Sequence, residues 1–210
     1  MSILVVGSVA LDTVETPFGR AERVLGGSAN YFAAAASLFG GVKVVGVIGD
    51  DYPMEKLDFL KERGVDFSGV VQAEGESFSW SGKYSFDLNH RDTLETRLGV
   101  FADFEPDIPE AFRRSRFVFL GNIDPVLQLR VLDQVEDPAM VACDTMNFWI
   151  EGRREPLLEV LSRVDVAFMN DAEARQLSGE HNLLHAARWI QSRGVRYVVL
   201  KKGEHGAILY

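Results

Sequence analysis

Short apolar runs alternate with helical patterns along most of this 210-residue sequence. The expected strands cover residues 3–6, 42–47, 65–71, 116–120, 140–143, 166–169 and 197–200. Helical patterns lie between most of them, at 28–39, 53–63, 125–135, 155–164, 171–178 and 182–192. Apolar strands that are separated by helices predict an α/β fold with a mostly parallel central sheet, covered by helices on both faces.

The segment 25–40, Leu-Gly-Gly-Ser-Ala-Asn-Tyr-Phe-Ala-Ala-Ala-Ala-Ser-Leu-Phe-Gly, combines a tight turn with a narrow helix. Gly26 and Gly27 allow the backbone to turn sharply and to come close to a ligand. Ser28 and Asn30 stand at the start of the helix, where free N–H groups and partial positive charge gather. The segment therefore fits a binding site, although an ordinary capped core helix explains the same residues.

The charge balance and the cysteine count exclude several classes of protein. The net charge is −9, so the chain lacks the positive field that nucleic-acid binding uses, and no nucleic-acid partner is expected. Cys143 is the one cysteine, which excludes an internal disulfide framework and suits a reducing compartment. No apolar run approaches the length of a membrane span, and the amino terminus is typical of a strand, not of a signal peptide. These features predict a cytoplasmic protein without a membrane partner.

Two stretches interrupt the alternation of strands and helices. Residues 75–104 alternate around a polar turn at 89–92, which predicts two antiparallel strands outside the main sheet. Residues 13–25 predict a hairpin that turns at 17–19. Together they would form a small lid of β-strands or a dimer surface. Packing within this sheet explains the aromatic residues, whereas an exposed aromatic face would favour a homodimer.

Polar side chains follow nearly every predicted strand. Because the carboxyl ends of parallel strands share one edge of a sheet, these side chains should converge where open α/β sheets bind ligands. Asp124 is explained more simply as a helix cap, and so is Asp171, which follows the strand-end residue Asn170. The strand-end residues are Asp12, Asn122, Asp124, Asp144, Asn147, Asn170, Glu173, Lys201 and Lys202.

Five short motifs occur in a fixed order along the chain. They are Gly-Ser-Val-Ala-Leu-Asp at 7–12, Gly-Gly-Ser-Ala-Asn at 26–30, Gly-Val-Ile-Gly-Asp-Asp at 46–51, Asn-Asp-Ala-Glu-Ala at 170–174 and Lys-Lys-Gly-Glu-His-Gly at 201–206. Each is weakly specific alone, but in this order the sequence resembles the ribokinase-like, or PfkB, carbohydrate kinase family. The resemblance implies one kinase domain with a three-layer ribokinase-like sandwich and a β lid at 13–25 and 75–104. It also implies Mg²⁺-dependent transfer of the γ-phosphoryl group of ATP to a hydroxymethyl group of a sugar or nucleoside.

The resemblance assigns roles to individual positions. The residues expected to bind the substrate hydroxyls are Asp12, Gly26, Gly27 and Asn30, together with the strand-end residues Asn122, Asp144 and Asn147. Asn170 and Glu173 would lie near the phosphates, with Glu173 reaching Mg²⁺ through water. The nucleotide site would continue through Lys201, Lys202, Gly203 and Gly206. The glycine pair is one residue tighter than the Gly-Gly-x-Gly-x-Asn form that is common in the family.

One part of the family pattern does not occur in this sequence. A Gly-Ala-Gly-Asp loop carries the family's catalytic Asp, and its backbone N–H groups bind the developing negative charge. That loop would come well after Tyr210, and the sequence stops within an apolar run, so we expect an interrupted kinase. No catalytic base is assigned, and the 210-residue chain alone should bind ATP poorly and have little or no kinase activity. The alternative is a non-catalytic substrate-binding or dimerisation module.

Other chemistries receive less support from the sequence. No strand leads into Gly-x-Gly-x-x-Gly, which disfavours a nucleotide-binding dehydrogenase. Cys143 has no evident histidine partner and is expected to be a core thiol. His181 and His185 are four residues apart but lack a third ligand for a metal. The acceptor itself is left open between a sugar, an inositol and a nucleoside.

Overall fold

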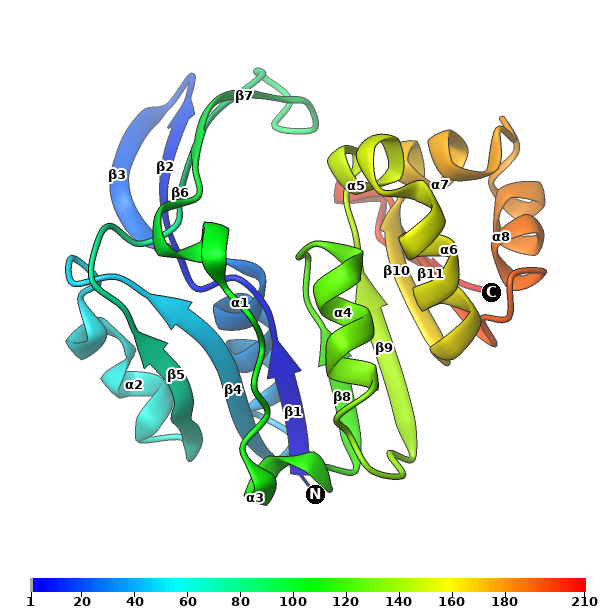
Figure 1. The fold of residues 1–210 in the computed structure, drawn as a ribbon. Coiled ribbons are helices and arrows are strands. Elements are labelled where there is room, and N and C mark those ends of the chain that lie inside the picture. Colours follow the sequence, from blue (N-terminus) through cyan, green and yellow to red (C-terminus); the bar gives the residue numbers. More distant parts are fainter. Residues whose placement is uncertain (1) are drawn as a thin grey trace. The chain divides into compact units, whose positions relative to one another are not determined.

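The structure is a computed structural model and describes residues 2–210. The chain forms two compact units, one ending at Asp107 and the other spanning Ile108–Tyr210 (Figure 1). Each unit contains strands of a parallel sheet with helices packed on them, as the sequence pattern predicts. None of the helices within residues 2–210 has the length and apolarity that crossing a membrane requires.

The first unit contains a parallel sheet in the order β1-β4-β5. Its strands are β1 (Ser2–Val6), β4 (Gly41–Ile48) and β5 (Val65–Gln72). Leu4, Val5 and Val6 are fully buried because β1 is apolar on both faces. The single helix expected at 53–63 is instead a 3₁₀ turn, η1 (Met54–Leu57), followed by the short α2 (Asp58–Lys61).

Helix α1 (Ser28–Ala36) packs against β1 and β4 through its small residues. Ala29 and Ala33 are fully buried, which confirms that the alanines allow close packing on the sheet. The helix ends at Ala36, earlier than the Gly40 boundary that the sequence suggested. Residues 37–39 continue as a tight turn in which the N–H of Phe39 donates to the carbonyl oxygen of Ala36.

A second sheet of four strands, in the order β3-β2-β6-β7, is built from the two stretches that interrupt the alternation; we call it the lid sheet (Figure 1). Its strands are β2 (Ala10–Thr16), β3 (Gly19–Gly26), β6 (Ser79–Tyr84) and β7 (Arg91–Arg97). Strands β2 and β3 form the predicted hairpin, and β6 and β7 are the predicted antiparallel pair. Strands β2 and β6 are parallel to each other. The alternation stops before Phe101, which is buried in the 3₁₀ turn η2 (Gly99–Asp103).

The second unit contains strands in the order β8-β9-β10-β11-β12, parallel except for the last pair. They are β8 (Phe117–Leu120), β9 (Met140–Asp144), β10 (Val166–Asn170), β11 (Tyr197–Lys201) and β12 (Ala207–Leu209). The helices are α3 (Glu110–Arg113), α4 (Pro125–Leu132), α5 (Asn147–Gly152), α6 (Arg154–Arg163), α7 (Asp171–Ser178) and α8 (Leu183–Gln191), with η3 (Gly203–His205) before β12.

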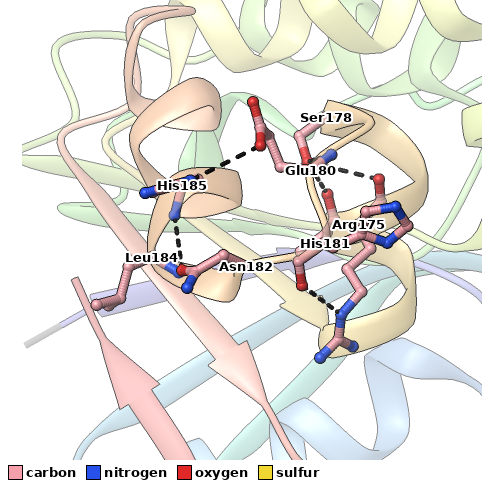
Figure 2. Close-up of polar contacts among 8 residues, drawn as sticks. Arg175, Ser178, Glu180, His181, Asn182, Leu184 and His185 are labelled. Atoms are coloured by element: carbon pink, nitrogen blue, oxygen red, sulfur yellow. Dashed lines mark hydrogen bonds and ion pairs between the residues drawn. The ribbon is translucent and has the colours of Figure 1, made fainter.

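The connection between α7 and α8 is fixed by local polar contacts, which Figure 2 shows. The Nε of Arg175 donates to the carbonyl oxygen of His181 at 3.0 Å. Asn182 caps α8 by accepting from the N–H of Leu184 at 2.9 Å. His185 Nδ1 lies 3.8 Å from a carboxylate oxygen of Glu180. These histidines therefore take part in a capping turn, and residues 2–210 contain no group of three side chains that could hold a metal ion.

Candidate functional site

Asp12 and the glycine pair form a compact group in the first unit. Asp12 lies on β2, and Gly26 ends the neighbouring strand β3. A Cβ at position 26 would overlap the carboxyl group of Asp12, and a Cβ at Gly27 would overlap the carbonyl oxygen of Ser8. Gly27 also has a φ of +92°, which L side chains rarely adopt. Both glycines are therefore required for the chain to fold closely around the carboxylate.

The carboxyl group of Asp12 is partly withdrawn from water. Burial raises its pKa from 3.8 to about 6, while a backbone hydrogen bond at Gly27 and the positive charge of Arg91 oppose the rise. The group is ionised at neutral pH, and a partly desolvated carboxylate is a strong acceptor for hydroxyl groups.

Asn30, on the first turn of α1, is buried and is aligned by two hydrogen bonds. Its Nδ2 donates to the carbonyl oxygen of Gly26 at 2.7 Å and to the hydroxyl oxygen of Tyr52 at 2.8 Å. Because a carbonyl oxygen can only accept, this contact fixes which end of the amide is nitrogen. The other end, Oδ1, is buried and has no hydrogen-bond partner among residues 2–210. A buried acceptor without a partner is costly, so it indicates a place for a donor from a ligand.

Tyr52 belongs to this group, although the sequence analysis did not include it. Its side chain is buried, and burial raises the pKa of its hydroxyl to about 12, with the negative charge of Asp12 adding to the rise. The signal available in the sequence was its position directly after the Gly-Asp-Asp motif at 49–51. We define Asp12, Gly26, Gly27, Asn30 and Tyr52 as the Asp12 group.

A second group lies at the carboxyl ends of β9, β10 and β11 in the second unit. Lys201 Nζ lies 2.9 Å from Asp144 Oδ1. Asn170 is the register partner of Lys201 on the adjacent strand. The sequence assigned Asp144 to the substrate and Lys201 to the nucleotide, whereas the structure pairs their side chains directly. We define Asp144, Asn170, Glu173 and Lys201 as the Lys201 group.

Asn170 and Glu173 make a reciprocal capping box at the start of α7. The N–H of Glu173 donates to Asn170 Oδ1, and the N–H of Asn170 donates to Glu173 Oε2, both at 2.7 Å. The cap is therefore Asn170, and Asp171 instead forms an ion pair with Arg175. The buried Glu173 carboxylate is therefore held at the end of β10.

The remaining strand-end candidates have mostly structural partners. Asn122 Oδ1 accepts from Trp149 Nε1 at 2.9 Å. Asp124 caps α4, as predicted, by accepting from the N–H of Val126 at 2.9 Å, and it also pairs with Arg153 at 3.1 Å. Asn147 is exposed at the start of α5.

The loop after β11 is a tight turn closed by its own backbone. The N–H of Lys202 donates to the carbonyl oxygen of Gly206 at 2.8 Å. Gly203 and Gly206 have φ of 57° and 80°, so both positions favour glycine.

Cys143 is buried within β9, and burial raises the pKa of its thiol, which agrees with a core role.

Comparison with known proteins finds similarity along nearly the whole chain. A family model described as pfkB family carbohydrate kinase matches residues 2–210. A cytidine kinase of Thermococcus kodakarensis is 31% identical over 214 residues, which is 100% of this chain and 76% of that protein.

Solved structures show the same fold. A putative ribokinase II from E. coli in complex with ATP and Mg²⁺ has a TM-score of 0.80 at 15% identity, covering 100% of this chain and 75% of that chain. A Burkholderia thailandensis nucleoside kinase in complex with inosine has a TM-score of 0.78 at 18% identity, covering 99% of this chain and 72% of that chain. At these identities the likeness shows a ribokinase-like α/β fold.

Proposed function

The chain belongs to the pfkB family of carbohydrate kinases, and within it we propose that the protein transfers the γ-phosphoryl group of ATP to a hydroxymethyl group of a nucleoside or sugar. The family relationship supports a kinase, and the relatives include a cytidine kinase and a nucleoside kinase in complex with inosine. The acceptor class and the roles of individual residues are part of the proposal.

The acceptor would bind at the Asp12 group. The observation that carries this assignment is Asn30 Oδ1, a buried acceptor without a partner among residues 2–210, on a side chain bonded to Gly26, which lies against the Asp12 carboxyl group. Vicinal hydroxyls offer two donors in a fixed geometry, so one could reach Asp12 and the other Asn30. Gly27 would keep the Asp12 group compact, because its missing Cβ lets the backbone lie against the carbonyl oxygen of Ser8.

The nucleotide would bind at the Lys201 group and the glycine turn after it. Lys201 would contact phosphate oxygens, and its pairing with Asp144 holds it at the strand end until they arrive. Glu173, fixed by its cap, would hold water molecules of the magnesium ion that accompanies ATP. When bound, that ion would neutralise negative charge on the phosphates.

Catalysis needs a general base, and this sequence lacks the loop that carries the base in the family. No Gly-Ala-Gly-Asp occurs among the 210 residues. We therefore propose that this chain alone binds an acceptor but turns over slowly or not at all, because both the base and the anion-binding N–H groups are missing.

The lid sheet supports a second proposal, a homodimer formed through its exposed aromatic residues. Phe18 and Phe86 are 70% and 77% exposed, and their ring centroids lie 5.6 Å apart. Phe18 lies in the turn between β2 and β3 and Phe86 in the turn after β6, and an exposed aromatic pair there favours burial against a second copy. Light scattering of the chain and of a Phe18→Ser, Phe86→Ser double variant tests it: a monomeric parent would exclude this interface.

Thermal unfolding with and without ligands tests the kinase assignment. The chain should be stabilised by at least one acceptor in a panel of ribose, inositol and nucleosides, and Asp12→Asn should lose that response. Asp103→Asn, at an exposed position in η2, is the matched control and should keep it. No response to any acceptor would contradict the assignment, and robust ADP release by the 210-residue chain would contradict the proposed inactivity.

A further inference from the structure

Trp80 stands next to Asp12 on the lid sheet. Strands β2 and β6 are parallel, and Asp12 and Trp80 are register partners. Partners in a parallel ladder direct their side chains to the same face of the sheet. The indole therefore shares a face with the carboxylate that we assign to the acceptor.

The indole lies flat along its strand. A Cβ at Gly82, two residues further on, would overlap the six-membered ring of Trp80. Trp80 Nε1 also donates to Thr93 Oγ1 on β7, at 3.2 Å. The ring is thus supported from below by a glycine and held at its edge by a hydrogen bond. The ring extends along β6 from the level of Asp12 to that of Gly82, a distance of about 7 Å.

Arg91 and two tyrosines border the same region. The guanidinium carbon of Arg91 lies 5.6 Å from the centroid of the Trp80 ring, and its positive charge acts on Asp12. Arg91 is the register partner of Tyr84, which is two residues beyond Gly82 on the same face of β6. Tyr31 of α1 is 64% exposed, and partial burial together with the negative charge of Asp12 raises the pKa of its hydroxyl.

We propose that Trp80 and Arg91 form the surface that binds the planar base of a nucleoside, while the Asp12 group holds its ribose. This inference rests on the proposed kinase function and narrows the acceptor to nucleosides. A flat indole held by Gly82 and Thr93, with the guanidinium of Arg91 over its ring, matches a planar base, which a simple sugar lacks. The guanidinium beside it offers N–H donors to carbonyl oxygens on the edge of the base.

A purely structural role predicts a different result. An aromatic ring that covers a strand glycine can stabilise a sheet without contacting any ligand. With such a role, replacing Trp80 would lower stability. It would affect the binding of every acceptor to the same extent, or not at all. A base-binding role makes it important for nucleosides and not for ribose.

Titration calorimetry of the full 210-residue chain with cytidine, uridine, adenosine and ribose separates these roles. Trp80→Ala should weaken binding of the preferred nucleoside by about ten- to a hundredfold, the range for loss of one base–aromatic stack. Ribose binding should not change. Trp80→Phe keeps an aromatic face and should keep most of the nucleoside affinity. This variant still tests the inference if the alanine variant does not fold.

Arginine variants provide a matched pair. Arg91→Ala should weaken nucleoside binding, whereas Arg97→Ala should not, because Arg97 is an exposed arginine of the same strand whose side chain pairs with Glu95. Equal losses for nucleoside and ribose, or unchanged nucleoside binding in Trp80→Ala, would overturn the inference. A parent chain that binds ribose but no nucleoside would overturn the inference and leave the kinase proposal standing, and one that binds neither would overturn both.

Discussion

Replacing Asp12 by Asn should stabilise the fold at neutral pH while removing acceptor binding. Burial raises the pKa of Asp12 from 3.8 to about 6, so the folded chain holds this proton more tightly than the unfolded chain. Stability therefore falls as the pH rises from about 4 to about 6, and the full cost of the ionised group is present above that window. A shift of about two pKa units corresponds to about 3 kcal/mol. Asn removes the charge and keeps an oxygen that can accept the hydrogen bond at Gly27.

The assay is thermal unfolding of the parent and Asp12→Asn chains at pH 4 and pH 7.5. For a chain of this size, about 3 kcal/mol corresponds to a higher Tm by about 6–12 °C for Asp12→Asn at pH 7.5. At pH 4 the difference should nearly vanish, because Asp12 is then mostly protonated in the folded parent. Asp103→Asn, an exposed control, should change stability at pH 7.5 by less than about 0.5 kcal/mol. An Asp12→Asn variant that is no more stable at pH 7.5, or equally stabilised at both pH values, would refute burial of the charge as the cause.

Three further substitutions test separate parts of the two sites. Gly27→Ala should lower stability by about 1–3 kcal/mol or more, because φ is +92° and its Cβ would overlap the Ser8 carbonyl oxygen; an unchanged Tm would contradict the close approach. Lys201→Met should change stability by less than about 1 kcal/mol, because its pair with Asp144 is partly exposed, but should weaken MgATP binding at least about tenfold in calorimetry. Asn170→Ala removes one half of the capping box and should lower Tm by about 2–4 °C without altering acceptor binding.

The fold was predictable because its signals are local. Apolar strands alternating with helical patterns fix a parallel sheet, and the period-two alternation at 79–84 marks a strand of the lid sheet. The prediction was wrong at 53–63, where Tyr52 and Pro53 lead into a 3₁₀ turn before a short helix. Periodicity distinguishes a helix from a strand, but it does not distinguish a continuous helix from two short turns with the same buried leucines.

The sequence motifs name candidate residues for the site, but they do not predict the contacts between those residues. Asp12 and Asn30 were identified from motifs, but the contact of Asn30 with Tyr52 joins residues 22 positions apart and depends on the path of a loop. The ion pair between Asp144 and Lys201 spans 57 positions and depends on the order of strands in the sheet. Neither separation leaves a pattern in the sequence, so tertiary structure alone supplies these contacts.

Glu173 is the position at which structural and functional explanations overlap most, and Glu173→Gln separates them. The capping box needs an oxygen at this position to accept the N–H of Asn170, and Gln supplies one. Stability should therefore change by less than about 1 kcal/mol, whereas MgATP binding should weaken because the negative charge toward the hydrated metal is gone. Calorimetry in the presence and absence of Mg²⁺ measures this, since an effect through the metal requires Mg²⁺. Equal MgATP affinity in parent and variant would mean that Glu173 serves the helix start alone, and that the Asn-x-x-Glu pattern here reports a cap and not a metal contact.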